Sequence, residues 1–215
     1  MILPLLRYSL SDLLRSQRFL IPCVLYAGLL AVLFGGDPGA PPAPWAASGL
    51  ALYPVAAWLA VTVANTEDPV QRDVTTAAAG SPWRVVGGLL ATCLVVDVVL
   101  VAMAIVWPMI ATRYEYPPQL VVAGALAHLA AAVSGTAVGL ACARPVLRGI
   151  GWTALAVAGI VVVTGIQNWL PPVGTAIKAL DAASPSLLVL ARDVAIALAL
   201  AALAGTLSVR FSRRR

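Results

Sequence analysis

The sequence is poor in charge for its length. Of its 215 residues, 11% are charged and 61% are hydrophobic, and the mean hydropathy is +0.93. Soluble domains carry about 25% charged and about 45–50% apolar residues, and one soluble core of this size cannot bury the excess. This composition excludes a disordered chain, a disulfide scaffold and a nucleic-acid-binding module. It predicts a polytopic membrane protein without a separate soluble domain.

The residues and motifs of most enzyme sites are also scarce. A single histidine argues against metal sites built on several His or on His/Cys spacing, and Cys23, Cys93 and Cys142 fall inside apolar runs, as buried thiols do. The chain lacks a Gly-x-x-x-x-Gly-Lys-[Ser/Thr] phosphate loop and a Gly-x-Ser-x-Gly nucleophile elbow. We therefore expect no ATPase activity in this chain, and no catalytic, cofactor-binding or metal-binding residues.

Six apolar stretches are long enough to cross about 30 Å of hydrocarbon as helices. They are residues 19–36, 46–64, 82–110, 120–143, 149–166 and 187–209. Five of the six tryptophans lie at or near their ends, where indole prefers the headgroup layer. A basic segment precedes the first stretch and no A-x-A-like site follows it, so we do not expect a cleaved signal peptide.

The basic residues predict the orientation of these spans. Eleven fall on one side: Arg7, Arg15, Arg18, Arg72, Arg84, Arg144, Arg148, Arg210, Arg213, Arg214 and Arg215. Only Arg113, Lys178 and Arg192 fall on the other. By the positive-inside rule, both termini are cytoplasmic. Thirteen arginines against one lysine, with abundant Ala, Gly and Pro, indicate a GC-rich bacterial genome, so the expected location is the bacterial inner membrane.

The segment before the first span is amphipathic. Leucines recur there at steps of three and four residues, with arginines on the other side of the same helix. This pattern over residues 2–18 predicts a helix lying in the cytoplasmic interface, with leucines toward the hydrocarbon and arginines toward the headgroups. Two roles remain open for it, a topology anchor or a mechanical element.

The loop between spans two and three contains a short helix with stop signals at both ends. Asp68 is a good N-cap, Pro69 suits the first helical position, and Gly80 suits the residue just past a helix end. These signals predict a helix over about residues 68–79, outside the membrane. Such a helix suits contact with a partner protein, although a solvated connector has the same signals.

Together these features resemble the membrane subunit of an ABC-2 type transporter (the type V exporter fold). The resemblance lies in an interfacial helix before span one, and in an acidic residue, a short helix and a small-Pro-aromatic-Arg segment after span two. It implies an all-α permease with six transmembrane helices, an N-terminal interfacial helix and a cytoplasmic coupling helix. It also implies a second, shorter cytoplasmic contact between spans four and five, and re-entrant helices between spans five and six, for which a short helix after Pro172 is the candidate.

The same resemblance implies the partners. Two permease subunits, identical or sister chains, assemble with two cytoplasmic ATP-binding cassette subunits, which bind the ATP and Mg and export an unidentified substrate. The implied contact residues are Glu67, Asp68, Val70, Arg72, Val74, Arg144 and Arg148. Val70 and Val74 form one face of the coupling helix, and Arg72 offers a charge on the other.

Asp97 and His128 lie deep in spans three and four at overlapping depths. A carboxylate in the membrane is costly and usually faces a partner or a water-filled cavity. The two residues are a possible polar pair, for substrate contact or a proton relay, or a buried Asp–His or Asp–hydroxyl hydrogen bond that fixes packing. Two other functions therefore stay open, an intramembrane enzyme using both residues as acid and base, and an assembly subunit without transport activity.

Span four also shows two distinct faces. Small residues and His128 share one face, which we expect to point into the bundle. The bulky side chains of the opposite face are expected to point to lipid, and they are Val122, Leu126, Leu129, Val133 and Leu140.

Overall fold

The computed structural model describes residues 2–147, 149–182 and 184–212, and over these residues the chain is all-helical, with nine helices and no strand. The helices are α1 (Ile2–Ser16), α2 (Leu20–Phe34), α3 (Ala43–Ala64), α4 (Pro69–Ala79), α5 (Pro82–Ala111), α6 (Pro118–Cys142), α7 (Ile150–Ile166), α8 (Val173–Leu180) and α9 (Leu187–Ser212).

Four of the described helices are long and apolar enough to cross a membrane. They are α3, α5, α6 and α9, with 22, 30, 25 and 26 residues. The pair α1 and α2, bent by 77° at a short break, adds a fifth candidate if it is counted as one broken span. Helix α7 is apolar but has 17 residues, fewer than the roughly 20 that span the hydrocarbon without tilt. This is the architecture of a multi-pass membrane protein.

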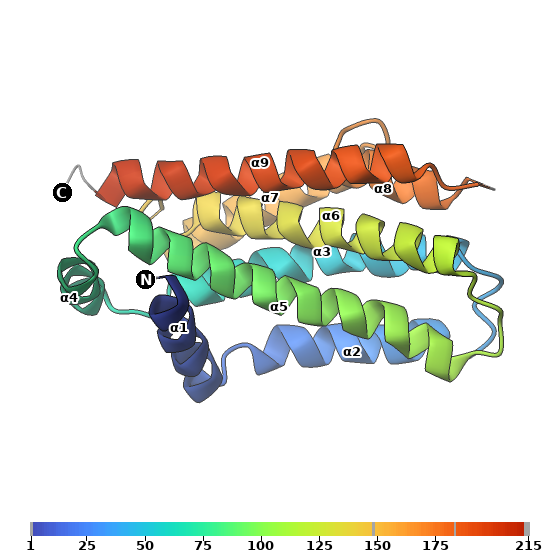
Figure 1. The fold of residues 1–215 in the computed structure, drawn as a ribbon, viewed down its shortest axis with the longest axis horizontal. Helices are drawn as coiled ribbons and strands as arrows, with labels where there is room; N and C mark the ends of the chain where they lie inside the picture. Colours follow the sequence, from blue (N-terminus) through green and yellow to red (C-terminus); the bar gives the residue numbers. More distant parts are fainter. Residues whose placement is uncertain (1, 148, 183, 213–215) are drawn as a thin grey trace.

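The helices run along the long axis of the molecule. In Figure 1, α2, α3, α5, α6, α7 and α9 lie lengthwise, and successive members of this set run in opposite directions. The short helix α4 and the C-terminal end of α9 lie at one end, here termed the α4 end, and α1 lies across the bundle near it. Helix α8 lies at the other end, the α8 end.

Helix α6 forms the centre of the bundle between α3 and α9. On the side facing α3, a Cβ added at Gly135 would clash with the Tyr53 carbonyl oxygen, and one at Gly139 would clash with that of Ala57. The two helices thus approach as closely as their backbones permit, which small residues allow.

The expectation that the bulky face of α6 points to lipid was wrong for two of its residues. Val133 is fully buried and packs with Ala197 and Ala201 of α9, and Leu140 is 3% exposed. The reason is that α9 covers this face, so α6 is enclosed on both sides. Val122, near the start of α6, is 47% exposed as expected.

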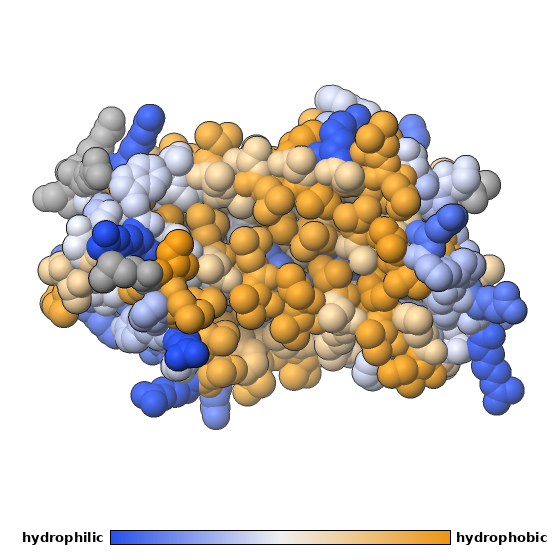
Figure 2. All heavy atoms as spheres, viewed as in Figure 1, coloured by the Kyte–Doolittle hydropathy of each residue, from blue (hydrophilic) through white to orange (hydrophobic). Residues whose placement is uncertain are grey.

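The surface is divided along the long axis. Figure 2 shows apolar side chains across the middle of the molecule and hydrophilic ones gathered at the two ends. Helix α7 contributes strongly to the exposed apolar surface, because Thr153 is its single buried residue. A broad apolar belt with polar ends is the surface that a lipid bilayer requires.

Candidate functional site

Helix α4 begins and ends at the predicted residues. The Asp68 carboxylate accepts a hydrogen bond from the backbone N–H of Val70 at 2.8 Å, and Pro69 occupies the first helical position. Gly80 follows the helix with φ +70°, a left-handed conformation that glycine adopts without cost. Ser81 then accepts from the backbone N–H of Trp83 at 3.3 Å and starts α5. The predicted caps at both ends are therefore confirmed.

No residue of α4 is buried, although the helix carries two valines. Val70 is 72% exposed and Val74 is 65% exposed, and they lie one turn apart on the helix. A helix of 11 residues is too short to be stable alone in water, so its conformation depends on the caps and on contacts with its neighbours.

One set of contacts ties α4 to α1. The Gln71 side-chain amide donates to the Tyr8 hydroxyl of α1 at 2.6 Å. The Thr75 hydroxyl donates to the Glu67 carboxylate at 3.1 Å, and this bond links α4 to the loop before it. Helix α1 in turn packs closely on α5, where a Cβ at Gly88 would lie 2.7 Å from the Leu5 Cβ.

A second set of contacts ties α4 to the loop between α6 and α7. The Arg72 guanidinium donates to the Ala64 carbonyl at 3.3 Å and to the Arg144 carbonyl at 3.4 Å. The Arg144 backbone N–H donates to the Asn65 side chain at 3.4 Å. Since Ala64 is the last residue of α3, Arg72 caps the carbonyl end of that helix, where a cation is stabilising.

The structure therefore brings most of the predicted contact residues to one place. Glu67, Arg72 and Arg144 line a shared cavity of about 220 Å³ at the α4 end, and Val70 is exposed nearby on α4. Arg148, also predicted here, lies outside the described residues. Sequence reasoning treated Arg72 as an outward charge, whereas it is half-buried and joins the two loops.

Asp97 and His128 are both buried, but they do not pair with each other. Asp97 accepts a hydrogen bond from the Thr136 hydroxyl of α6 at 2.8 Å. His128 donates from Nδ1 to the Gly124 carbonyl at 2.7 Å, and its Nε2 lies 2.9 Å from the Ser48 hydroxyl of α3. No hydrogen bond or ion pair joins the two in the described part of the chain.

Asp97 and His128 do not pair because they lie at different depths along the bundle. Thr136 lies eight residues beyond His128 on α6, which is about 12 Å along the helix axis. Of the predicted alternatives, the structure shows the buried Asp–hydroxyl hydrogen bond for Asp97, and His128 makes a separate contact with the Ser48 hydroxyl. Each contact joins a buried side chain to a hydroxyl on a neighbouring helix. These contacts tie α5 and α3 to α6.

Sequence reasoning missed one buried carboxylate. Asp193 of α9 is fully buried, accepts from the Thr175 hydroxyl of α8 at 2.6 Å and forms an ion pair with Arg192 at 2.9 Å. Asp193 lies six residues into α9, close to the predicted outer end of that span, where the sequence alone does not distinguish a buried carboxylate from an exposed one. The available signal was the adjacent Arg192, a basic residue inside an apolar run.

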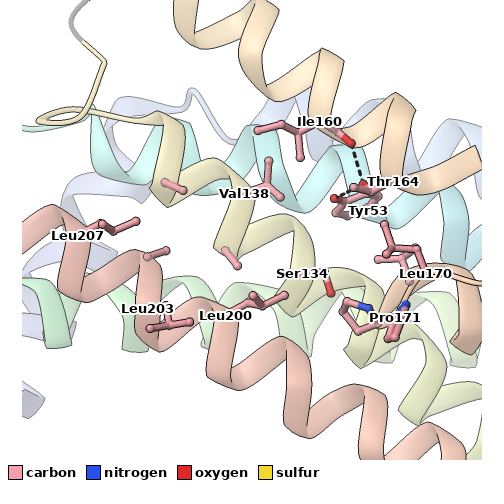
Figure 3. Close-up of a pocket in the computed structure, with 15 residues that line it drawn as sticks. Tyr53, Ser134, Val138, Ile160, Thr164, Leu170, Pro171, Leu200, Leu203 and Leu207 are labelled. Atoms are coloured by element: carbon pink, nitrogen blue, oxygen red, sulfur yellow. Dashed lines mark hydrogen bonds between the residues drawn. The ribbon is translucent and has the colours of Figure 1, made fainter. Parts of the chain in front are cut away.

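A cavity of about 400 Å³ lies between α3, α6, α7 and α9 (Figure 3). Leucines of α9 form one wall, and Tyr53 of α3 reaches the opposite one. The Tyr53 and Thr164 hydroxyls are 2.9 Å apart, and Thr164 also donates to the Ile160 carbonyl at 2.7 Å. The third hydroxyl of the lining, Ser134, donates to the Ala130 carbonyl. All three hydroxyls are thus already bonded within the protein, so the cavity suits an apolar occupant. Among the described residues, no group of three His, Cys, Asp or Glu could hold a metal ion.

Comparison with protein-family models, with curated proteins and with solved structures finds no match to this chain. Its function is therefore argued from its own residues.

Proposed function

We propose that this chain is the membrane-spanning permease subunit of an ATP-binding cassette exporter of the ABC-2 type. Helices α2, α3, α5, α6, α7 and α9 are its six spans, α1 lies in the cytoplasmic interface, and α4 is the coupling helix. Both termini face the cytoplasm of a bacterial cell. Two permease subunits, identical or sister chains, assemble with two ATPase subunits, which carry the ATP, the Mg and the hydrolysis.

The main observation in support of the proposal is that α4 is an ordered helix with exposed valines. It is capped at both ends, has no buried residue, and exposes Val70 and Val74. Exposed valines on an ordered helix at the polar end of a membrane protein favour a protein partner. A solvated connector has no need of apolar residues at these positions.

The contacts of α4 support a mechanical role. The helix is bonded to α1 through Gln71 and Tyr8, and to the end of α3 and the second loop through Arg72. A displacement of α4 by a partner is thereby passed to α1, to α3 and to the segment that follows the end of α6, rather than absorbed by a free loop. The partner supplies the ATP-driven movement, and the permease converts it into rearrangement of the spans.

The test is Val70→Asp in the purified complex. Val70 is preferred to Val74 because Val74 also lines a groove shared with α1. An unpaired carboxylate buried in the contact costs several kcal/mol, which is at least a tenfold loss of affinity for the ATPase subunit. We expect loss of ATPase retention and of substrate-stimulated hydrolysis.

The matched control is Val70→Thr, which keeps the branched shape without adding a charge. It should retain most of the ATPase. The isolated Val70→Asp chain should insert in the membrane and melt as the unsubstituted chain does, because exposed substitutions change stability by about 0.5 kcal/mol or less. If Val70→Asp keeps the ATPase and its stimulated turnover, α4 is not the coupling helix and the proposal loses its main support.

A further inference from the structure

A groove of about 520 Å³ lies at the α4 end between three helices. Its lining includes Leu5 and Tyr8 of α1, Val74 and Ala78 of α4, and Arg84 of α5. We call it the α1/α4 groove. Its walls are held in place, because α1 packs on α5 at Gly88 and bonds to α4 through Tyr8.

The groove combines apolar walls with a single cation. Leu5, Val74 and Ala78 offer hydrocarbon, whereas Arg84 carries the charge. The Arg84 guanidinium donates one hydrogen bond, to the Ala79 carbonyl at 2.9 Å. Within the described residues this bond uses one of the five N–H donors of the guanidinium, so Arg84 retains donors for an anion.

Acidic residues are kept apart from Arg84. The carboxylates of Asp12 and Glu67 line a neighbouring small cavity of about 20 Å³, which shares Tyr8 and Thr75 with the groove, and Glu67 accepts the Thr75 hydroxyl there. In the part of the chain that the structure describes, no carboxylate lines the α1/α4 groove itself. The electrostatic preference of the groove is therefore for a negative group.

The groove lies where the apolar belt meets the polar end. Helix α1 is bent 77° from α2 and lies across the bundle in Figure 1, with Ile2 and Leu3 more than half exposed. Trp83, beside Arg84, is 48% exposed, and indole side chains favour the headgroup layer. An occupant at this depth meets hydrocarbon on one side and headgroups on the other.

We propose that the α1/α4 groove binds one anionic phospholipid from the leaflet at the α4 end. Its phosphate pairs with the Arg84 guanidinium, and the upper part of an acyl chain lies against Leu5, Val74 and Ala78. Basic pockets between helices at a membrane surface recognise acidic headgroups in this way. The groove shares Val74 with the proposed ATPase contact, but the inference rests on Arg84 and on α1, and the Val70→Asp test probes the ATPase contact separately.

The test uses the full-length chain in nanodiscs of phosphatidylcholine and phosphatidylglycerol at equal amounts. After the chain is released from the nanodisc, native mass spectrometry counts and identifies the lipids that remain bound to it. We expect one retained phosphatidylglycerol, with about fivefold weaker retention in Arg84→Gln, since one basic residue contributes about that factor near a membrane surface. Ala78→Trp fills the groove while keeping Arg84, and it should abolish the retention of phosphatidylglycerol.

Two matched controls distinguish lipid binding in the groove from a general effect of surface charge or of added bulk. Arg15→Gln removes an equal charge from the other end of α1, and Ala77→Trp adds the same bulk to the neighbouring, exposed position of α4. Both should keep the lipid. Equal loss in Arg15→Gln, or retention of phosphatidylglycerol in Ala78→Trp, overturns the proposal.

A photo-crosslinking amino acid at position 78, with position 77 as the control, identifies the occupant in cells. Labelling of phospholipid from position 78 alone is the expected result. Labelling of a protein subunit from position 78 instead would make the groove a protein contact and would overturn the lipid site, whatever the outcome of the Val70→Asp test.

Discussion

The buried acidic and basic side chains of the described residues follow one pattern. Asp97, His128 and Asp193 each contact a hydroxyl on another helix, supplied by Thr136, Ser48 and Thr175 respectively. A hydroxyl serves as donor or acceptor, so it can satisfy either kind of buried group without a second charge. These contacts therefore join pairs of helices within the apolar interior.

Because Asp97 and His128 make separate contacts, we expect substitutions at the two residues to change the stability of the chain independently. Thr136→Val leaves the Asp97 carboxyl without its partner and should cost about 1–3 kcal/mol of stability. Asp97→Asn should be milder than Asp97→Leu, because the amide can still accept from Thr136. Adding His128→Leu to either variant should give a sum of the single effects to within about 0.5 kcal/mol, as for distant sites. Thermal denaturation of the detergent-purified chain measures this, and a large non-additive term would restore the Asp97–His128 pair.

A pH effect is expected in the loops at the α8 end. The Tyr114 hydroxyl and the Gly39 amide both donate to Asp37, and they lower the pKa of this exposed carboxyl below its ordinary 3.8. Because the folded pKa is the lower one, the contact stabilises the fold above pH 3.8 and is lost as the pH falls through the folded pKa. Carboxyl NMR titration should show that Tyr114→Phe raises the Asp37 pKa toward its ordinary value, whereas Tyr116→Phe should not.

At the scale of elements, the tightest contact is that between α3 and α6. Gly135 and Gly139 lie against the α3 backbone, where any added carbon meets a carbonyl oxygen. Helix α7 is the opposite case, since it has a single buried residue and is attached to the bundle by partly buried side chains such as Val161 and by the Tyr53–Thr164 bond. The bundle thus combines a closely packed pair of helices with a loosely attached one.

Gly135→Ala should destabilise the chain by about 1–3 kcal/mol, the usual cost of overpacking a core. The matched control is Gly159→Ala on α7, where an added Cβ meets nothing within 4 Å. That variant should melt at or slightly above the temperature of the unsubstituted chain, because alanine favours helix over glycine. Equal melting temperatures for the two variants would contradict the close α3–α6 approach.

At the scale of the whole molecule, the basic residues gather where the helices bring their ends together. Arg7, Arg72, Arg84, Arg144 and Arg210 come from five different helices or loops. They meet at the α4 end because the lengthwise helices alternate in direction (Figure 1). Basic residues that are far apart in the sequence thus give the two ends of the molecule different charge.

The proposed orientation predicts the accessibility of two positions at opposite ends of the molecule. In a background without Cys23, Cys93 and Cys142, Ala40→Cys should react with an impermeant thiol reagent in intact cells. Ser212→Cys should react only after the membrane is opened, because the positive end faces the cytoplasm. The reverse labelling pattern would overturn the orientation.

Local signals in the sequence predicted those helix ends that nearby residues determine. Asp68, Gly80 and Ser81 cap helices through contacts within a few residues of the chain. The ends of α4 and the start of α5 could therefore be predicted from the sequence. The partners of Asp97, Arg72 and Val133 were not, because each depends on which helix packs beside it and at what depth. Hydrophobic spacing indicates that a face is apolar, but it does not distinguish lipid from a neighbouring helix such as α9.

The 77° bend between α1 and α2 has a consequence for the bilayer itself in the proposed arrangement. There α1 takes up area in one leaflet only, whereas α8 at the other end has half of its eight residues buried within the bundle. A chain placed in this way is wider in one leaflet than in the other. Lateral tension or curvature that changes the room in that leaflet would then act first on the contact of α1 with α5, and the mechanical state of the membrane would become an input to this protein alongside any soluble partner.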